Sequence, residues 1–468
     1  MTASAPASAA APLALPPGPR ARYPGEFVFA MGRDPLGFFR DLQRRHGDVA
    51  RFRAMGRDFV LLAHPDMVRE VLVTEQRRYA RGYRYHALKL LLGEGLLTSE
   101  GAFHLRQRRL AQPAFHRERV AHYALAMGRA ADAWHARWTA LAADAAGTGA
   151  PARVDMADEM GKLALAIVSA TLFGNDVTDE ADAVARALDV ALHSATPAFV
   201  AVARWALHLP IPAARRFKQA RADLDAVVYR LIDERRRGGG DGQDLLSLLL
   251  NATDTEGEDG DGARMTDLQL RDEAMTLFLA GHETTANALA WTWYLLARHP
   301  EVAERLRASL DATLDGRTPT MDDVPRLGYA RQVLSEAMRL YPPAYAIGRI
   351  ALEDVTFGGW RVPARAGVIV SQWLVHRDPR WWPEPERFDP DRWAPGAGAD
   401  RHRFAYFPFG AGTRICIGEQ FAWTEALVVL ATLAARWRPA LVPGVDVTPE
   451  PIITLRPRDG LPMTLHAR

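Results

Sequence analysis

Hydrophobic positions along the chain recur mostly at helical spacing. Between residues 64 and about 349, apolar side chains return every three or four positions with short breaks, which predicts a succession of helices. Two polar breaks, at 236–240 and 251–264, predict mobile loops. Residues 48–63 alternate apolar and polar side chains instead, which predicts a β-hairpin ahead of the helices. The pattern as a whole indicates a mainly α-helical fold with small β-sheets.

The last third of the chain mixes strands with irregular structure. Strand-like runs return at 350–358 and 368–371, and a stretch rich in Pro and Trp at 378–395 predicts irregular backbone. One more long helix is predicted after residue 416. At the C-terminal end, residues 452–456 and 461–466 predict a closing β-hairpin.

Composition narrows the class of protein. With 48% hydrophobic and 24% charged residues, the sequence is typical of a soluble globular protein, and a net charge of +2 does not suggest nucleic-acid binding. Residues 1–24 form a flexible leader rich in Ala and Pro, and residues 25–468 are expected to form one large domain. The leader has neither a basic start nor a long apolar run, so we expect no signal peptide and no membrane anchor. A single cysteine excludes an internal disulfide and fits the cytoplasm.

That cysteine, Cys416, lies in the sequence FGAGTRICIG at 409–418. Glycines such as Gly418 let a backbone approach a flat ligand that a Cβ would obstruct. Arg414 offers a planar fork of donors to an anionic group, and Phe409 would shield the sulfur from water. A lone cysteine in such a turn is more often an inert side chain. The pattern F-x-x-G-x-R-x-C-x-G, however, resembles the haem-binding loop of the cytochromes P450, and the chain resembles that family over nearly its whole length.

The resemblance implies a cofactor and a fold. In this family the loop cysteine is the axial thiolate ligand of haem iron, and its electron donation favours cleavage of a bound O–O bond. Haem b (iron protoporphyrin IX) is therefore the implied cofactor, with Cys416 as the metal ligand. The implied fold is the cytochrome P450 fold in a single large domain. Arg414 is implied to pair with a haem propionate.

Other basic residues are further candidates for the propionates. His104 and Arg108 are four residues apart, so they share one face of a segment that resembles the family's propionate helix. Arg349 is a third candidate, after the Pro-Pro turn at 342–343. The alternative for all three is a solvated basic face. The neighbouring Arg106, Arg109, Arg117 and Arg119 are expected to lie on that face rather than at the propionates. That face would dock an acidic electron-transfer protein.

A second motif interrupts the long apolar run at 275–296. Its sequence AGHETT, at 280–285, places a glycine, an acid and two hydroxyls where a buried helix would favour other residues. Thr284 follows Ala280 by four residues, so its hydroxyl can capture that carbonyl and loosen the helix. The stretch resembles the central helix motif of the P450 family. The resemblance implies that Glu283 carries protons from solvent and that Thr284 assists at the iron; the alternative is an amphipathic helix with a solvent-facing acid.

A third motif concerns structure. Glu336 and Arg339 are three residues apart on one predicted helix, a spacing that most often forms an exposed pair of little energetic value. In the P450 family this pair is buried and joined by the arginine of a P-E-R-F segment, which we assigned to residues 385–388. The resemblance therefore implies a buried network of Glu336, Arg339 and Arg387.

Family resemblance also implies which segments line a substrate pocket. The members are mainly apolar, and each one alone is as readily explained by core packing. They are Tyr85, Leu88, Leu91, Leu92, Leu277, Phe278, Ala280, Ala344, Ala346, Ile347, Ile452 and Ile453. A pocket of this kind selects by shape and burial. Arg and Tyr residues at 81–86 are candidates for anchoring a carboxylate, with a surface loop as the alternative.

These motifs predict a haem-thiolate monooxygenase. It would insert one oxygen atom from O₂ into an apolar small molecule such as a fatty acid, a terpenoid or another secondary metabolite. No flavin or iron–sulfur domain is evident after Cys416, so electrons would come from separate proteins, with a ferredoxin and its reductase expected. One alternative is a peroxide-using or rearranging P450, but such members commonly depart from the acid–alcohol pair kept here at Glu283 and Thr284. Another is a non-catalytic haem-based ligand or gas sensor, which would not need that pair.

Overall fold

The computed structural model describes residues 13–147, 149–174, 211–238, 242–254 and 264–468. Most of the loop expected at 251–264, and part of the one at 236–240, lie outside these ranges. The helices are α1 (Glu26–Arg33), α2 (Pro35–His46), α3 (Pro65–Arg69), α4 (Tyr83–Leu92), α5 (Gly101–Ala111), α6 (Arg117–Ala146), α7 (Met156–Phe173), α10 (Pro212–Arg236), α11 (Leu245–Asn251), α12 (Asp267–Arg298), α13 (Pro300–Leu314), α14 (Gly328–Leu340), α15 (Gln372–Val375) and α16 (Glu419–Ala434). The strands are β1 (Val49–Ala54), β2 (Arg57–Leu62), β3 (Tyr79–Arg81), β4 (Arg153–Asp155), β5 (Ile347–Ala351), β6 (Val355–Phe357), β7 (Trp360–Val362), β8 (Gly367–Val370), β9 (Ala440–Leu441), β10 (Pro449–Pro451), β11 (Leu455–Pro457) and β12 (Pro462–Thr464). The mainly α-helical class with small sheets is confirmed.

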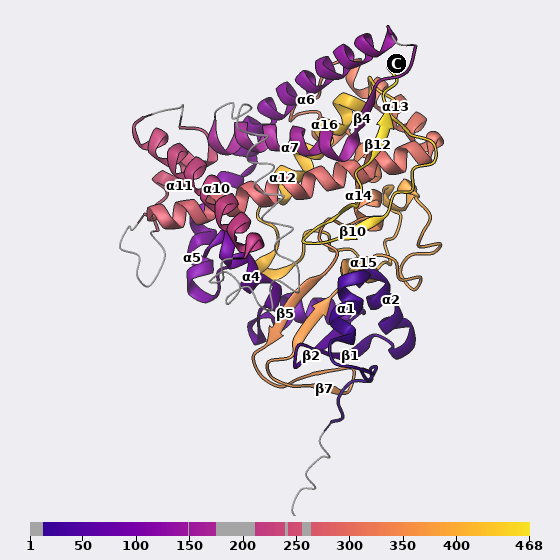
Figure 1. Ribbon diagram of the computed structural model, residues 1–468. Helices are drawn as coiled ribbons and strands as arrows, with labels where there is room; N and C mark the ends of the chain where they lie inside the picture. Colours follow the sequence, from indigo (N-terminus) through magenta and orange to yellow (C-terminus); the bar gives the residue numbers. More distant parts are fainter. Residues whose placement is uncertain (1–12, 148, 175–210, 239–241, 255–263) are drawn as a thin grey trace, which may run out of the picture.

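Helix α12 runs through the middle of the molecule, and α7, α10, α14 and α16 pack against it (Figure 1). Its start is fixed by a capping box, in which Thr266 and Gln269 each satisfy the other's backbone N–H. Beyond that cap, all side chains at 270–279 and 285–296 are buried. Because these buried stretches cover every side of the helix, α12 lies inside the core and is the element around which the others are arranged.

The largest sheet lies at one end of the molecule, beside α1 and α2 (Figure 1). Its strand order is β1-β2-β8-β5-β3, and β2 and β8 run parallel while the other neighbours are antiparallel. The predicted hairpin at 48–63 is confirmed as β1 and β2. Strand β5 begins at Ile347, three residues earlier than expected, because Ile347 pairs with Val370. Strand β3 fell within the region expected to be helical and is stabilised by its pairing with β5.

The predicted C-terminal hairpin is wrong. Strand β11 pairs with β10, whereas β12 pairs with β4 and β9 in a different sheet. Leu461 and Met463 are fully buried in the main core, and the Leu461 carbonyl accepts a hydrogen bond from the Met156 N–H at 2.8 Å. Burial of these side chains therefore directs β12 away from β11.

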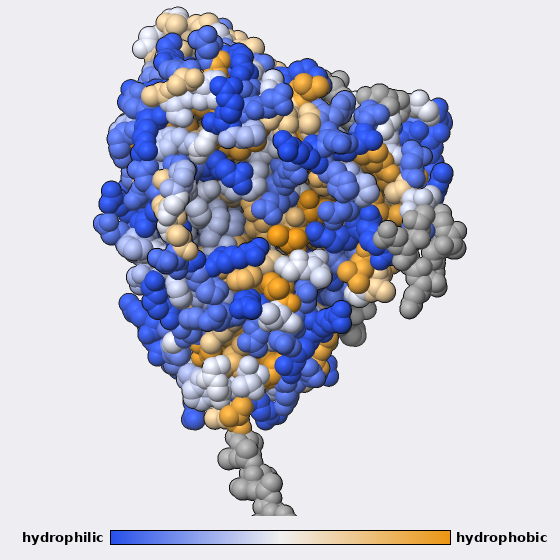
Figure 2. Space-filling model, turned by 180° about the vertical axis from the view of Figure 1, so that it is seen from behind, coloured by the Kyte–Doolittle hydropathy of each residue, from blue (hydrophilic) through white to orange (hydrophobic). Residues whose placement is uncertain are grey.

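The N-terminal segment contacts the sheets upstream of the boundary expected at residue 24. The Arg51 N–H donates to the Pro17 carbonyl at 2.8 Å, and the Arg361 N–H donates to the Ala14 carbonyl at 2.9 Å. Pro16, between them, is buried. The folded unit therefore begins before residue 25. No helix in the described ranges combines the length and apolarity needed to span a bilayer, and the face seen from behind is mostly hydrophilic with small apolar areas (Figure 2).

Candidate active site

The loop that precedes α16 presents Cys416. Gly410 and Gly412 both have positive φ, 73° and 72°, so the chain turns tightly there. A Cβ on Gly412 would lie 1.9 Å from the Leu72 carbonyl oxygen, so this position also requires glycine for close approach. The Cys416 N–H donates to the Phe409 carbonyl at 3.0 Å and closes the loop.

The environment of the sulfur is protein-rich although the side chain is accessible. Cys416 is exposed, yet surrounding protein raises the pKa of its thiol to about 11 by desolvation, and a hydrogen bond from the Gly418 backbone opposes this shift. Phe409, whose carbonyl accepts the hydrogen bond from the Cys416 N–H, packs its ring on that of Trp423 at 5.9 Å between centroids. A thiol of this kind becomes a thiolate when it coordinates a metal cation.

Beside this loop, three guanidinium groups gather with one carboxylate. Arg81 on β3 lies directly opposite Arg349 on β5 in the antiparallel register, and both side chains are buried. Glu100 accepts a hydrogen bond from the Arg81 N–H at 2.6 Å and from Arg414 Nη2 at 3.0 Å. Burial and Arg81 lower the pKa of Arg414 to about 10, and they also lower the pKa of Arg349. His104 is buried in the same region, and burial together with Arg414 lowers its pKa to about 3, so its ring is neutral.

This cationic cluster (the three arginines Arg81, Arg349 and Arg414, together with the neutral His104) fits the propionates of haem. Like charges directly opposite each other on neighbouring strands are destabilising. Two of the cluster's nitrogen atoms, Arg81 Nε and His104 Nε2, are buried and have no hydrogen-bond partner among the described residues. A ligand with two carboxylates would supply both the missing acceptors and the missing negative charge. The donor set therefore fits haem, with Cys416 as the thiolate.

Three of the four residues expected at the propionates lie in one cluster, and the fourth has another role. His104, Arg349 and Arg414 lie together, whereas Arg108 donates from Nη1 to the Ile415 carbonyl at 2.8 Å and so holds the main chain of the cysteine loop. Arg81 was missing from the expected set, because β3 is too short to be read as a strand and its pairing with β5 is not local. Tyr85 belongs at the edge of this cluster, since the Arg81 guanidinium stacks 4.7 Å from its ring centroid.

The central motif of α12 is the one part of that helix's buried stretch where side chains are accessible. Ala280 is exposed, and residues 281–284 are partly exposed, between buried residues on either side. Thr284 Oγ1 donates to the Ala280 carbonyl at 2.6 Å, as predicted. The helix nevertheless stays α-helical through this point, so the predicted loosening is not observed. A Cβ on Gly281 would lie 2.9 Å from the Val168 side chain of α7, which explains the glycine as a close helix contact.

Glu283 and His282, neighbours in this motif, contact different parts of the molecule. Glu283 Oε1 accepts a hydrogen bond from Thr454 Oγ1 at 2.6 Å, from the turn between β10 and β11. Sequence reasoning missed Thr454, because residues 452–456 gave only a strand signal. His282 packs toward Gly161 of α7, and burial lowers its pKa to about 4.

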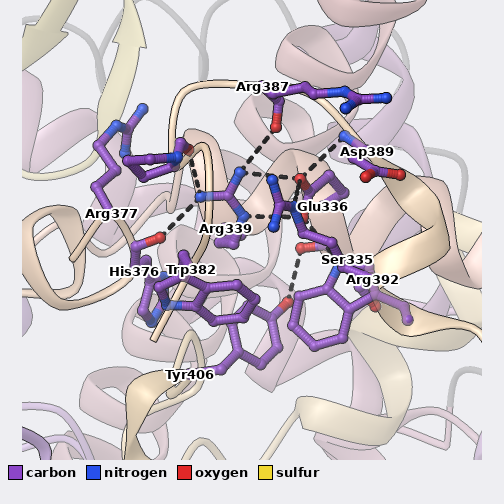
Figure 3. A network of polar contacts seen from close by, with 12 residues as sticks. Ser335, Glu336, Arg339, His376, Arg377, Trp382, Arg387, Asp389, Arg392 and Tyr406 are labelled. Carbon is purple, nitrogen blue, oxygen red and sulfur yellow. Dashed lines mark hydrogen bonds and ion pairs between the residues drawn. The ribbon is translucent and has the colours of Figure 1, made fainter. Parts of the chain in front are cut away.

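Glu336 and Arg339 form a buried network on α14 (Figure 3). Arg339 donates to both carboxylate oxygens of Glu336, from Nε at 2.8 Å and from Nη2 at 2.9 Å, and both side chains are fully buried. Arg339 Nη1 also donates to the His376 carbonyl at 2.9 Å. His376 Nε2 in turn accepts from the Phe407 N–H at 3.0 Å, just before the cysteine loop. The pair therefore braces the segment that leads to Cys416.

The role expected for Arg387 is wrong and belongs to Arg392. The Arg387 side chain is 60% exposed and pairs with Glu384 at 3.1 Å, pointing away from Glu336, and only its main-chain carbonyl reaches Arg339, at 3.1 Å (Figure 3). Arg392 Nε lies 3.2 Å from Glu336 Oε1 with 9% of its side chain exposed. The sequence contains P-E-R-F and then P-D-R-W five residues later, so the pattern P-x-R-aromatic occurs twice. Its 3-10 turn, Pro390–Trp393, packs on α14 and so delivers Arg392 to Glu336.

The expected pocket residues fall into two groups. One group packs in a single apolar cluster between α4, α10, α11 and α12 and is buried or borders that cluster: Tyr85, Leu88, Leu91, Leu92, Leu277, Phe278 and Ile453. The other is partly or fully exposed and lies on α12, on the segment that leads into β5 and its first residue, and on the turn before β11: Ala280, Ala344, Ala346, Ile347 and Ile452. Leu91 and Leu92 are 3% and 0% exposed, so they are core residues rather than pocket lining.

Known proteins resemble this chain over most of its length. The family model "Cytochrome P450" matches residues 16–460. Cyclooctatin synthase of Streptomyces melanosporofaciens is 40% identical over 427 residues, which cover 91% of this chain and 90% of that protein. Pentalenene oxygenase of Streptomyces avermitilis is 36% identical over 442 residues, which cover 94% and 95%. The crystal structure of the cytochrome P450DA haem domain superimposes with a TM-score of 0.85 at 30% identity, covering 97% of this chain and 98% of that one. With its cysteine loop, cationic cluster and buried Glu–Arg pair, the chain belongs to the cytochrome P450 family of monooxygenases.

Proposed function

We propose that this protein is a monooxygenase of terpenoids, with haem b bound through Cys416 and electrons delivered by a ferredoxin and its reductase. The observation that carries the substrate class is the agreement among three bacterial relatives. They are named cyclooctatin synthase, cyclooctat-9-en-7-ol 5-monooxygenase and pentalenene oxygenase, and each is matched over about nine tenths of this chain. The accessible side chains on α12 and the adjoining turns are mainly small or apolar, which suits a hydrocarbon skeleton.

A fatty acid is the weaker candidate because the polar residues at 81–86 have other partners. Arg81 belongs to the cationic cluster, and Tyr85 packs against Arg81 at its edge. The Tyr83 hydroxyl donates to the Arg365 carbonyl at 2.8 Å and accepts from Arg57. Arg84 donates to the Tyr345 hydroxyl at 2.6 Å and also to the Ile452 carbonyl. These side chains are therefore already engaged with protein groups, with which the carboxylate of a fatty acid would compete.

The residues of the site divide the work. Haem iron with a thiolate ligand supplies the activation of O₂ for insertion into an unactivated bond. Cys416 would hold that iron, and the cationic cluster would hold the propionates. Thr284 has a hydroxyl at the accessible part of α12, and Glu283 lies beside it as a proton carrier from solvent. Glu336 with Arg339 and Arg392 keeps the cysteine loop in place.

An absorption titration of the haem-loaded ferric protein tests the proposal. Pentalenene, geranylgeraniol and dodecanoic acid would be added separately, and a shift of the iron from low to high spin is expected for the terpenoids. A shift with dodecanoic acid alone would overturn the terpenoid assignment. A reduced carbonyl complex without the absorption typical of thiolate-ligated haem would overturn the role of Cys416.

A further inference from the structure

Thr454 connects the acid of α12 to the C-terminal sheet. It lies in the turn between β10 and β11, and 6% of it is exposed. Its hydroxyl donates to Glu283 Oε1 at 2.6 Å and accepts from Asn287 Nδ2 at 3.0 Å. Asn287 is one helical turn beyond Glu283, so the acid, the hydroxyl and the amide form one chain of hydrogen bonds across two elements.

The direction of this chain is fixed by the number of protons available. The Thr454 hydroxyl has a single proton, and it donates that proton to Glu283 Oε1. The amide of Asn287 must then donate to the hydroxyl oxygen. Asn287 therefore orients Thr454, and Thr454 holds the carboxyl group of Glu283 by a short hydrogen bond of 2.6 Å.

The turn that carries Thr454 is itself held from both sides. On one side, Trp291 Nε1 of α12 donates to the Leu455 carbonyl at 2.9 Å. On the other side, the Leu455 N–H donates to the Pro343 carbonyl at 2.9 Å, and the Tyr345 hydroxyl donates to the Ile452 carbonyl at 3.1 Å. The turn thus ties α12 to the segment before β5. Ile453, next to Thr454, packs against the apolar cluster between α4 and α12.

We infer that Thr454 is a positioning residue for Glu283. Its hydroxyl holds the carboxyl group of Glu283 at the accessible part of α12, and the anchored turn from 452 to 455 holds that hydroxyl in place. The inference rests on the proposed function and deepens it, because it assigns the control of proton delivery to a residue outside the α12 motif.

The first test needs neither a substrate nor a redox partner. The infrared C–O stretch of the reduced carbonyl complex reports the polar surroundings of the iron. We expect T454V to shift or split this band, because the Glu283 carboxyl group loses the hydrogen bond from Thr454, and we expect T454S to restore the wild-type band. T292V is the matched control: Thr292 is buried on the same helix, and its hydroxyl donates to the Ala288 carbonyl at 2.7 Å. A wild-type band in T454V, or an equal change in T292V, would overturn the inference.

The second test measures how much product forms per NADH consumed. With pentalenene, ferredoxin and reductase, T454V is expected to give about 10-fold less product per NADH, which is less than the full rate effect of a general acid because Glu283 is still present. The spectral dissociation constant of pentalenene should be unchanged. T454S should recover most of the yield. If T454V does not retain haem, N287L removes the donor that orients Thr454 and should lower the yield in the same direction. A loss in E283Q without a loss in T454V and N287L would overturn the role of Thr454, whereas no loss in E283Q would overturn the proposed role of the acid itself.

Discussion

Arg392 and Arg387 stand in the same P-x-R-aromatic pattern, five residues apart, and replacing each by methionine should have very different effects. Arg392 has 9% of its side chain exposed and pairs with Glu336, which is fully buried. Arg387 is 60% exposed and pairs with the exposed Glu384. Its part in the network is a main-chain carbonyl, which a side-chain substitution leaves in place. The comparison therefore isolates the buried charge.

The expected magnitudes follow from burial. Removing one partner of a buried ion pair costs about 3–5 kcal/mol. In R392M the Glu336 carboxylate still accepts from Arg339, from Trp393 Nε1 at 2.9 Å and from the Asp389 N–H at 3.0 Å, so the loss should fall near 3 kcal/mol, the lower limit of that range. An exposed pair contributes about 0–1 kcal/mol. R387M should therefore be close to wild-type.

Urea unfolding of the haem-loaded variants measures this difference. Tryptophan fluorescence and haem absorbance would be followed together, and R392M should unfold and release haem at clearly lower urea than R387M. Equal loss of stability in the two variants, or a larger loss in R387M, would refute the assignment of Arg392 to the buried network.

Three further predictions concern the loop, the cluster and pH. G412A should lower the haem content sharply, since its Cβ would meet a carbonyl oxygen at 1.9 Å. G316A is the control, because Gly316 has a similar φ of 78° with no atom near its Cβ position, so this variant should cost only the backbone strain of about 1–2 kcal/mol. The haem-to-protein ratio of the purified variants measures the difference, and an equal ratio in the two would contradict the prediction. R81M should stabilise the haem-free protein by up to about 1 kcal/mol, because it removes a like charge opposite Arg349, but it should weaken haem binding. Urea unfolding of the haem-free protein measures the first effect, and haem titration measures the second. A haem-free variant that is less stable than wild-type would contradict the repulsion between the two arginines. Burial raises the pKa of Glu425 on α16 to about 8, against 4.5 for a free group, so its contribution to stability is present at low pH and is lost as pH rises from about 5 to 8. E425Q should flatten that dependence and be more stable than wild-type at about pH 8; unfolding midpoints across this range test it, and an unchanged slope would contradict the shift.

Local patterns were predicted well where the structure depends on neighbours in sequence. The hairpin of β1 and β2 follows from alternation, and the Thr284 hydrogen bond to the Ala280 carbonyl follows from a spacing of four residues on a helix. The burial of Glu336 with Arg339 required the family resemblance, because the spacing alone more often forms an exposed pair.

The misses share a cause, which is contact between distant segments. The sequence does not show which of the two P-x-R-aromatic segments supplies the buried arginine. Arg392 takes this role because its segment packs on α14. Arg81 becomes part of the cluster only when β3 pairs with β5. Thr454 becomes significant only when its turn meets α12. The pairing predicted for the C-terminal strand was wrong for the same reason, because β12 pairs with the distant strands β4 and β9.

The central claim is that this chain inserts oxygen from O₂ into a terpenoid. The most direct measurement is mass spectrometry of the products formed from pentalenene under isotopically labelled O₂, with ferredoxin, reductase and NADH. A product that carries one labelled oxygen atom, absent when Cys416 is replaced by alanine, is the predicted result. A haem-loaded enzyme that consumes NADH without oxygenating pentalenene or geranylgeraniol, or a product whose oxygen comes from water, would contradict the account.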